Sequence, residues 1–229
     1  HPNTIETFRD KRVLDAGCGG GQHVTRVATV AREVVGADLN TAELMRARMS
    51  SMPNVRIIEA DIARMEDPEG FDVTYSIGVI HHTDDPDATF RNLARLTNHG
   101  GRTIVWVYSH EGNFLNRVFV EGAKSLLIFH LPKAVVKAIA WLLTVALYVP
   151  VFTLYLLPLR FLPYHEYFQN FRKLTFLQNY LNVFDKLNAP QTHFITRDRI
   201  ARWFAENGYR DIHISPYRGV SWRGSGTRN

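Results

Sequence analysis

The stretch Asp15-Ala16-Gly17-Cys18-Gly19-Gly20-Gly21 follows the apolar residues Val13 and Leu14 and leads into a helical pattern from Gln22 to Ala31. This order predicts a buried strand, a glycine-rich turn and a helix, which together bring the backbone close to a nucleotide-like ligand. Glycine suits the turn because a side chain there would collide with the ligand or with the turn itself. The carboxylate two residues before Gly17 favours a ligand with a cationic end.

A nicotinamide or flavin dinucleotide site is the main alternative for such a turn, and its pattern is G-x-G-x-x-G. The third glycine of that pattern would fall on Gln22 when counted from Gly17, and on Val24 when counted from Gly19. The dinucleotide pattern therefore fails in both registers. Taken alone, the glycines also fit an ordinary tight turn between a strand and a helix.

Three further apolar segments end in residues that suit ligand binding, as strands do at the carboxyl edge of an open parallel sheet. The segments and the residues of interest are 34–40 with Asp38 and Leu39, 55–62 with Asp61 and Ile62, and 71–82 with Ser76, His81 and His82. We expect these strand ends to converge on one edge of the sheet, around the glycine-rich turn.

These motifs resemble those of class I S-adenosylmethionine-dependent methyltransferases, over residues 11–109 and again from about residue 193. The resemblance implies S-adenosylmethionine as cofactor and S-adenosylhomocysteine as product. It implies that Asp15 binds the methionine amino group, Asp38 the ribose hydroxyls, and Asp61 and Ile62 the adenine. The expected cofactor-binding residues are Asp15, Gly17, Gly19, Gly21, Asp38, Leu39, Asp61, Ile62 and Ser76.

Strand patterns alternate with helical patterns in the first half of the chain, which predicts parallel pairing and right-handed crossovers. We expect an α/β fold with a Rossmann-like doubly wound sheet, mostly parallel, and an antiparallel hairpin at its C-terminal edge. Asp85-Pro86 predicts the start of a helix and Gly100-Gly101 its end, before a strand from Thr103. Pro216 predicts the turn between the last two strands.

Three regions are expected. Residues 1–112 form the cofactor-binding core, residues 113–192 form an apolar and largely helical insert, and residues 193–229 add a helix and strands that complete the sheet. With 229 residues, 45% of them hydrophobic, the chain can bury the core of one domain with an added element. The chain begins at His1 without a methionine, so we expect natural sequence to precede it.

The insert combines apolar sequence with positive charge. Residues 138–159 form a run of 22 residues without a charged side chain, which is long enough to cross a hydrocarbon core. Seven Lys or Arg and two Glu give residues 113–175 a net charge of +5, equal to that of the whole chain. The positive charge is therefore concentrated beside the most apolar segment.

Three interpretations of the insert are open. A single transmembrane helix is disfavoured because the C-terminal residues are expected to complete the same sheet as residues 11–109, and because Pro150 and Pro158 should interrupt a long helix. Short apolar helices in a membrane interface fit the flanking Lys and Arg and the amphipathic Trp141 and Tyr148. A lid over the active site, or a homodimer interface in a soluble enzyme, fits equally well.

Methyl transfer is an in-line displacement, in which the protein chiefly aligns donor and acceptor and excludes water. A hydroxyl or carbon acceptor must also lose a proton, which calls for a base with a near-neutral pKa. The candidate catalytic bases are His81 and His82, after the fourth strand, and His193, in the polar run before the C-terminal region. For each of them, a capping or packing role is the alternative.

Metal and nucleic-acid sites are disfavoured. The acids that follow His82 fit helix capping better than the ligand spacing of a zinc site, so no metal is expected. The single cysteine, Cys18, excludes a disulfide framework and indicates the cytoplasm. The basic residues of the insert are interleaved with Leu and Val, and Arg218, Arg223 and Arg228 form only a thin basic footprint, so no nucleic-acid partner is expected.

The sequence thus predicts an S-adenosylmethionine-dependent methyltransferase that methylates oxygen, or carbon, of an apolar or lipid-linked small molecule. We expect a cytoplasmic protein, with the inner face of the membrane or a second copy of the chain as candidate partners of the insert. The alternative function is a non-catalytic module that keeps the cofactor fold and dimerises or docks through its insert. The presence of Asp15, the glycines, Asp38 and Asp61 argues against that alternative.

Overall fold

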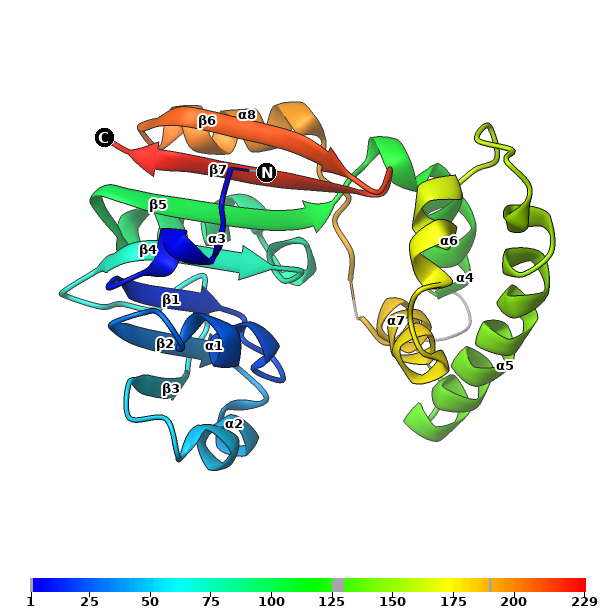
Figure 1. Cartoon of the computed structure of the whole chain (residues 1–229), viewed down its shortest axis with the longest axis horizontal. Helices are drawn as coiled ribbons and strands as arrows, with labels where there is room; N and C mark the ends of the chain where they lie inside the picture. Colours follow the sequence, from blue (N-terminus) through cyan, green and yellow to red (C-terminus); the bar gives the residue numbers. More distant parts are fainter. Residues whose placement is uncertain (1, 125–129, 190) are drawn as a thin grey trace. The chain divides into compact units, whose positions relative to one another are not determined.

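Figure 1 shows the computed structural model, which describes residues 2–124, 130–189 and 191–229. The chain forms two compact units. The first, called the sheet unit, comprises residues 1–108, 195–215 and 222–229, and the second, called the helical unit, comprises residues 109–194 and 216–221. Among the described residues, the sheet unit has a buried apolar cluster on each face of its sheet, and the helical unit has a smaller one.

A seven-stranded sheet runs through the sheet unit in the order β3-β2-β1-β4-β5-β7-β6. The strands are β1 (Arg12–Ala16), β2 (Glu33–Asp38), β3 (Val55–Glu59), β4 (Phe71–Ile77), β5 (Thr97–Tyr108), β6 (Tyr209–Tyr217) and β7 (Ser221–Arg228). The first five pair in parallel, whereas β7 runs antiparallel to β5 (Figure 1). The predicted doubly wound sheet, mostly parallel with an antiparallel C-terminal hairpin, is confirmed.

The central strands are buried on both faces. Successive residues of a strand point to opposite faces of its sheet, so Val13 and Val34 pack on one face while Leu14 and Val35 pack on the other. All four are 0% exposed. Continuous apolar runs of this kind are typical of parallel strands that have helices on both sides.

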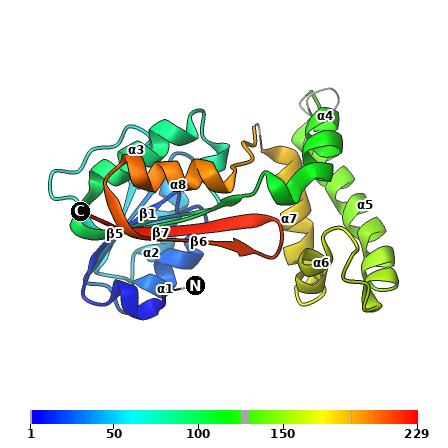
Figure 2. The same ribbon diagram turned by 90° about the horizontal axis from the view of Figure 1, so that it is seen from above.

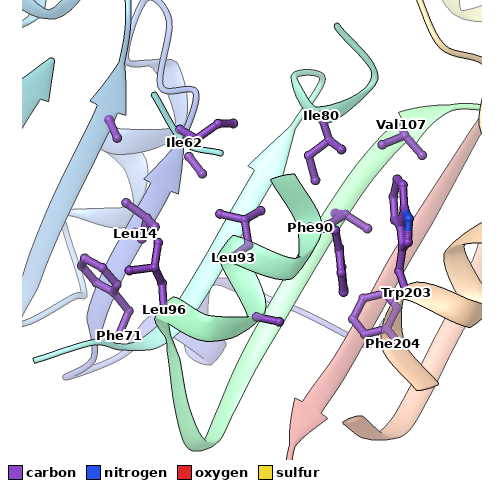
Figure 3. Packing of buried hydrophobic residues seen from close by; sticks show 14 of the residues in the cluster. Leu14, Ile62, Phe71, Ile80, Phe90, Leu93, Leu96, Val107, Trp203 and Phe204 are labelled. Carbon is purple, nitrogen blue, oxygen red and sulfur yellow. The ribbon is translucent and has the colours of Figure 1, made fainter. Parts of the chain in front are cut away.

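Helices cover both faces of this sheet (Figure 2). They are α1 (Gln22–Val27), α2 (Ala42–Met49), α3 (Pro86–Leu96) and α8 (Arg197–Glu206), with the short 3-10 helices η1 (Ile5–Phe8) and η2 (Ile80–His82). The first two helices pack on the face of Val13, and α3 and α8 pack on the face of Leu14. Figure 3 shows Phe90 of α3 beside Trp203 of α8, and their ring centroids lie 5.2 Å apart.

Two predicted boundaries are wrong. The predicted start of α3 is correct, because the Asp85 carboxylate accepts hydrogen bonds from two N–H groups of the first turn. The helix nevertheless ends at Leu96, and Gly100-Gly101 lies inside β5 because Thr97 already pairs with Phe71 of β4. The last turn occupies residues 218–220, whereas Pro216 lies within β6, an edge strand where a missing N–H is tolerated.

The helical unit contains the insert. Its elements are the 3-10 helix η3 (Glu111–Asn113), the π-helix η4 (Asn116–Val120), α4 (Glu121–Ala123), α5 (Lys133–Val151), the 3-10 helix η6 (Leu154–Leu156), α6 (His165–Phe171) and α7 (Phe176–Asn188). Val136 and Ala140 of α5 pack against Leu187 of α7 in a small buried cluster. The insert is thus helical in its described residues, as expected, but it is built around one long helix as well as short ones.

The charge-free run 138–159 does not form one continuous helix, as expected from its prolines. α5 includes Pro150 but ends at the next residue, Val151, and turns and η6 follow it. By length and composition alone, α5 is the one helix of the described residues that would suffice to cross a membrane, with a mean hydropathy of 2.0. Strands on both sides of α5 in the chain, β5 and β7, are neighbours in one sheet. That arrangement disfavours a single crossing between them.

Candidate functional site

The glycine-rich turn joins β1 to α1 at the carboxyl edge of the sheet. Gly17, Gly19 and Gly21 have φ angles of +90°, +47° and +76°, in the left-handed region that favours glycine. The N–H groups of Gly17 and Cys18 both donate to the carbonyl oxygen of Ala37 at the end of β2, at 2.8 and 3.1 Å. The turn is therefore held against the neighbouring strand, and its backbone is tightly curved.

The three glycines face different surroundings. A Cβ atom on Gly17 would lie 2.4 Å from Cγ2 of Val79, and one on Gly21 would lie 2.0 Å from Cε of Met45. A Cβ atom on Gly19 would meet no heavy atom within 4 Å. Packing within the protein explains Gly17 and Gly21, whereas Gly19 borders open space in which a ligand can approach the backbone.

Asp15 occupies the penultimate position of β1, where it is 2% exposed. Its Oδ2 atom accepts a 2.8 Å hydrogen bond from the hydroxyl of Tyr75 on β4. Burial raises the pKa of the Asp15 carboxyl to about 7, the Tyr75 hydrogen bond opposes that shift, and the charge of Asp38 adds to it. The carboxylate is thus buried at a cost that a bound cation would offset.

This arrangement fits the predicted cofactor. A methionine ammonium group is a cation of the right size to pair with a buried carboxylate, and its binding would favour the ionised form of Asp15. Sequence analysis missed Tyr75. The pairing register of β1 and β4 places Tyr75 directly beside Asp15, and no local pattern in the sequence announces that register.

Asp38 ends β2 and holds two loops together. Its Oδ1 atom accepts hydrogen bonds from the N–H groups of Asn40 and Thr41, at 2.9 and 3.0 Å, and Oδ2 accepts one from Gly19 at 3.0 Å. The Thr41 hydroxyl in turn donates to the Gly19 carbonyl oxygen at 2.8 Å. A carboxylate offers about four acceptor positions, so three are engaged by backbone. The predicted contact of Asp38 with ribose hydroxyls stays a prediction, and ordering of the glycine turn is a second role.

The other predicted cofactor residues differ in exposure. Leu39 is 56% exposed and follows Asp38 directly, whereas Ile62 is 6% exposed and packs in the main apolar cluster. Asp61 accepts a 2.9 Å hydrogen bond from the N–H of Ala63, which fixes its carboxylate within the loop. Ser76 is fully buried and donates to the carbonyl oxygen of Ala16, so its hydroxyl joins β4 to β1. Their contacts with the cofactor remain predictions.

The candidate bases fall into two groups. His81 and His82 lie together in η2 with ring centroids 4.2 Å apart, and the His81 ring also lies 4.3 Å from that of Tyr108 at the end of β5. His81 is fully buried, whereas His82 is partly exposed. His193 belongs to the helical unit. Among the residues that the structure describes, no group of three or more His, Cys, Asp and Glu side chains is arranged to hold a metal ion.

Cys18 lies in the turn and packs in the apolar cluster on the α1 and α2 face of the sheet. Burial raises the pKa of its thiol to about 12, with further contributions from the charges of Asp15 and Asp38. A thiol that stays protonated at neutral pH is a poor nucleophile. The position therefore fits a packing role.

Comparisons with known sequences identify relatives of the sheet unit. Residues 14–105 match the family model described as a methyltransferase domain. A ubiquinone biosynthesis O-methyltransferase from Aliivibrio fischeri is 31% identical over 123 residues, which cover 51% of this chain and 52% of that protein. A tRNA U34 carboxymethyltransferase from Pseudoalteromonas atlantica is 28% identical over 123 residues, which cover 52% of this chain and 38% of that protein. The matched part of this chain therefore spans about half, or less, of these relatives.

Comparisons with solved structures support the fold. An O-methyltransferase family protein from Burkholderia thailandensis superposes with a TM-score of 0.60 and 13% identity, covering 100% of this chain and 53% of that one. A magnesium protoporphyrin IX methyltransferase from Synechocystis, solved with bound S-adenosylhomocysteine, superposes with a TM-score of 0.55 and 14% identity. The match covers 97% of this chain and 76% of that one. The predicted family and cofactor are confirmed. The sheet unit contains a methyltransferase domain of the class I S-adenosylmethionine-dependent family.

Proposed function

We propose that the protein transfers a methyl group from S-adenosylmethionine to oxygen, or carbon, of an apolar or lipid-linked small molecule. The observation that carries methyl transfer is the buried Asp15 carboxylate beside a glycine turn whose Gly19 borders open space. The acceptor class is supported by the helical unit, which holds most of the large apolar side chains exposed among the described residues.

Different residues of the sheet unit have different roles in methyl transfer. Asp15 pairs with the ammonium group of the cofactor, and Tyr75 keeps that carboxylate oriented by its hydrogen bond. Asp38 and Thr41 fix the Gly19 backbone, so the cofactor meets a turn that is already ordered. The bound cofactor supplies an electrophilic methyl group and a neutral thioether leaving group.

A base completes the reaction when the acceptor carries a proton. We assign this role to His82, because it is partly exposed while its neighbour His81 is fully buried among aromatic rings. Its imidazole accepts the proton of a hydroxyl acceptor as the methyl group is transferred. His193 remains a second candidate in the helical unit.

An apolar acceptor agrees with the surface of α5. Trp141, Leu142 and Val149 are 50%, 61% and 68% exposed, and Lys133 and Lys137 lie on the same helix. Apolar side chains flanked by cations suit a membrane interface with anionic lipids. We therefore place the protein in the cytoplasm at the inner face of the membrane. If a second copy of the chain covers the same surface instead, the protein is a homodimer.

The relatives give two further classes for comparison. One is named for ubiquinone biosynthesis, which favours a hydroxyl on an apolar small molecule, and the other is named for a tRNA nucleotide. The exposed apolar side chains favour the first class, because a protein surface that binds nucleic acid is usually polar and positively charged. A non-catalytic module that docks through the helical unit is the alternative from another class.

The test uses methyl-labelled S-adenosylmethionine with the protein and a lysate of the source cells. Lipid, aqueous and macromolecular fractions are counted separately, with the Asp15→Asn variant as control. Label in the lipid fraction that depends on Asp15 supports the proposed acceptor. Label in the aqueous or macromolecular fraction overturns the acceptor class, and the absence of transfer together with no binding of S-adenosylhomocysteine identifies a non-catalytic module.

A further inference from the structure

A cavity of about 320 Å³ lies within the helical unit, between α5, α6 and α7. Its walls include Leu143 and Leu147 of α5, Tyr167 and Phe168 of α6, and Val183 of α7. The volume lies in the range of roughly 300–1,000 Å³ that is usual for small-molecule sites. Most of its walls are apolar side chains, so an apolar ligand gains by leaving water.

One wall of this cavity carries a positive charge. The Nζ atom of Lys186 lies 3.1 Å from the Tyr167 hydroxyl and 4.3 Å from the centre of the Tyr167 ring. This contact holds the ammonium group beside the aromatic wall. Among the described residues that line the cavity, Lys186 is the cation and none is acidic. The chemistry of the wall therefore favours an anionic group next to a hydrocarbon chain.

The wall at Tyr164 is held in an unusual backbone conformation. Tyr164 has a φ of +58°, in the left-handed region that side chains other than glycine rarely adopt. Its hydroxyl oxygen accepts a 3.2 Å hydrogen bond from the N–H of Asn116, and its ring lines the cavity. Strained positions of this kind cluster at ligand sites. The backbone conformation and this hydrogen bond together hold Tyr164 in the wall of the cavity.

We propose that this cavity binds the hydrocarbon chain of an anionic single-chain amphiphile, with its carboxylate or phosphate beside Lys186. The ligand is bound within the helical unit. The hydrocarbon packs against Leu143, Leu147 and Val183. The anionic end pairs with the Lys186 ammonium, which lies at the polar side of the Tyr167 ring.

Binding is measured with the whole chain and a fluorescent fatty acid, cis-parinaric acid, displaced by dodecyl phosphate below its micelle concentration. Leu147→Trp and Val183→Phe fill the cavity, and each should lower the affinity for the fluorescent probe by about tenfold or more. Leu142→Trp is the matched control, because Leu142 lies on the same helix, is 61% exposed and does not line the cavity. Circular dichroism establishes which variants keep the fold. Two cavity-filling variants are made so that, if one does not fold, the other still tests the cavity.

The charge is tested separately. Lys186→Gln should lower the affinity for dodecyl phosphate by about fivefold to tenfold and leave the affinity for dodecanol unchanged, since only the phosphate pairs with the ammonium group. Lys137→Gln removes the same charge from exposed α5 surface and should change neither. Equal binding by the folded filling variants and the parent would overturn the cavity as the site, and equal loss of phosphate and alcohol in Lys186→Gln would overturn the anionic specificity.

A third measurement separates this proposal from the proposed function. Binding of S-adenosylhomocysteine is followed in the same variants by thermal shift. If the unmodified protein does not bind S-adenosylhomocysteine, methyl transfer is refuted. Binding of the fluorescent probe still tests the cavity in that case.

Discussion

The hydroxyl of Tyr75 donates a 2.8 Å hydrogen bond to Oδ2 of Asp15, and the two residues are register partners on β4 and β1. Burial favours the protonated form of this carboxyl, while the Tyr75 hydrogen bond favours the ionised form. The pKa of Asp15 is thereby raised to about 7. Cofactor binding should therefore depend on pH in the neutral range.

The affinity for S-adenosylhomocysteine is expected to fall as the pH drops. The ammonium group needs an ionised Asp15, and a carboxyl with a pKa of about 7 is mostly ionised at pH 8 and mostly protonated at pH 6. The dissociation constant should rise by about tenfold between these pH values. Isothermal titration calorimetry at both values measures the change. A flat profile would show that Asp15 does not bind the ammonium group.

Replacement of Tyr75 by phenylalanine should shift that profile. Tyr75→Phe keeps the aromatic ring in the core but removes the hydroxyl that stabilises the ionised carboxyl. The pKa of Asp15 should rise further, so the weakening of S-adenosylhomocysteine should begin at a higher pH than in the parent. At pH 8 we expect an affinity about threefold to tenfold lower. An unchanged midpoint would mean that Tyr75 serves packing alone.

Asp15→Asn should stabilise the protein without cofactor at alkaline pH. The folded-state pKa of about 7 lies above the ordinary value of 3.8. The contribution of Asp15 to stability is therefore fully present below about pH 4 and is lost as the pH rises towards 7. Asparagine does not ionise, so at pH 8 the variant should be more stable by about 1–4 kcal/mol. Urea unfolding at pH 4 and pH 8 checks this, and a variant less stable than the parent at pH 8 would contradict it.

Two glycines of the turn should respond differently to alanine. Gly17→Ala places a Cβ atom 2.4 Å from Val79 at a left-handed φ, so we expect a loss of about 2–5 kcal/mol of stability. Gly19→Ala meets no heavy atom within 4 Å, so its loss should be about 1–2 kcal/mol, from backbone strain alone. If the cofactor passes over Gly19, this variant nevertheless loses binding of S-adenosylhomocysteine. Thermal unfolding and calorimetry together separate the two effects, and a Gly19→Ala protein that binds normally would move the cofactor away from this residue.

Substitution of the two adjacent histidines should have different effects, one on stability and the other on the rate of methyl transfer. His81 is fully buried against the Tyr108 ring, so His81→Ala should lower the free energy of unfolding by about 2–4 kcal/mol. His82 is partly exposed, so His82→Ala should keep the fold and lower the rate of methyl transfer by about 10²–10⁴-fold at neutral pH. The labelled-methyl assay and urea unfolding are made on both variants. A His82→Ala enzyme with the parent's rate would show that the base is another residue.

The sequence predicted the order of the helices and strands better than the residues at which they begin and end. The apolar runs and the glycine turn predicted the order of strands and helices up to β5, because helix periodicity and turn chemistry are local properties. The end of α3 and the turn after β6 were misplaced. In both cases strand pairing extended the sheet past a glycine or a proline that locally favours a turn.

Only the tertiary structure decided how the candidate residues meet. Asp15, the glycines and Asp38 were each visible as motifs, but the bond of Tyr75 to Asp15 depends on a register between strands 60 residues apart in the chain. The difference in burial between His81 and His82 depends on the aromatic side chains of β5, which no local pattern assigns. Likewise, the charge and apolar character of the insert were plain from composition. The cavity beside Lys186 exists because α5, α6 and α7 pack together, and long-range packing is not encoded in any short segment.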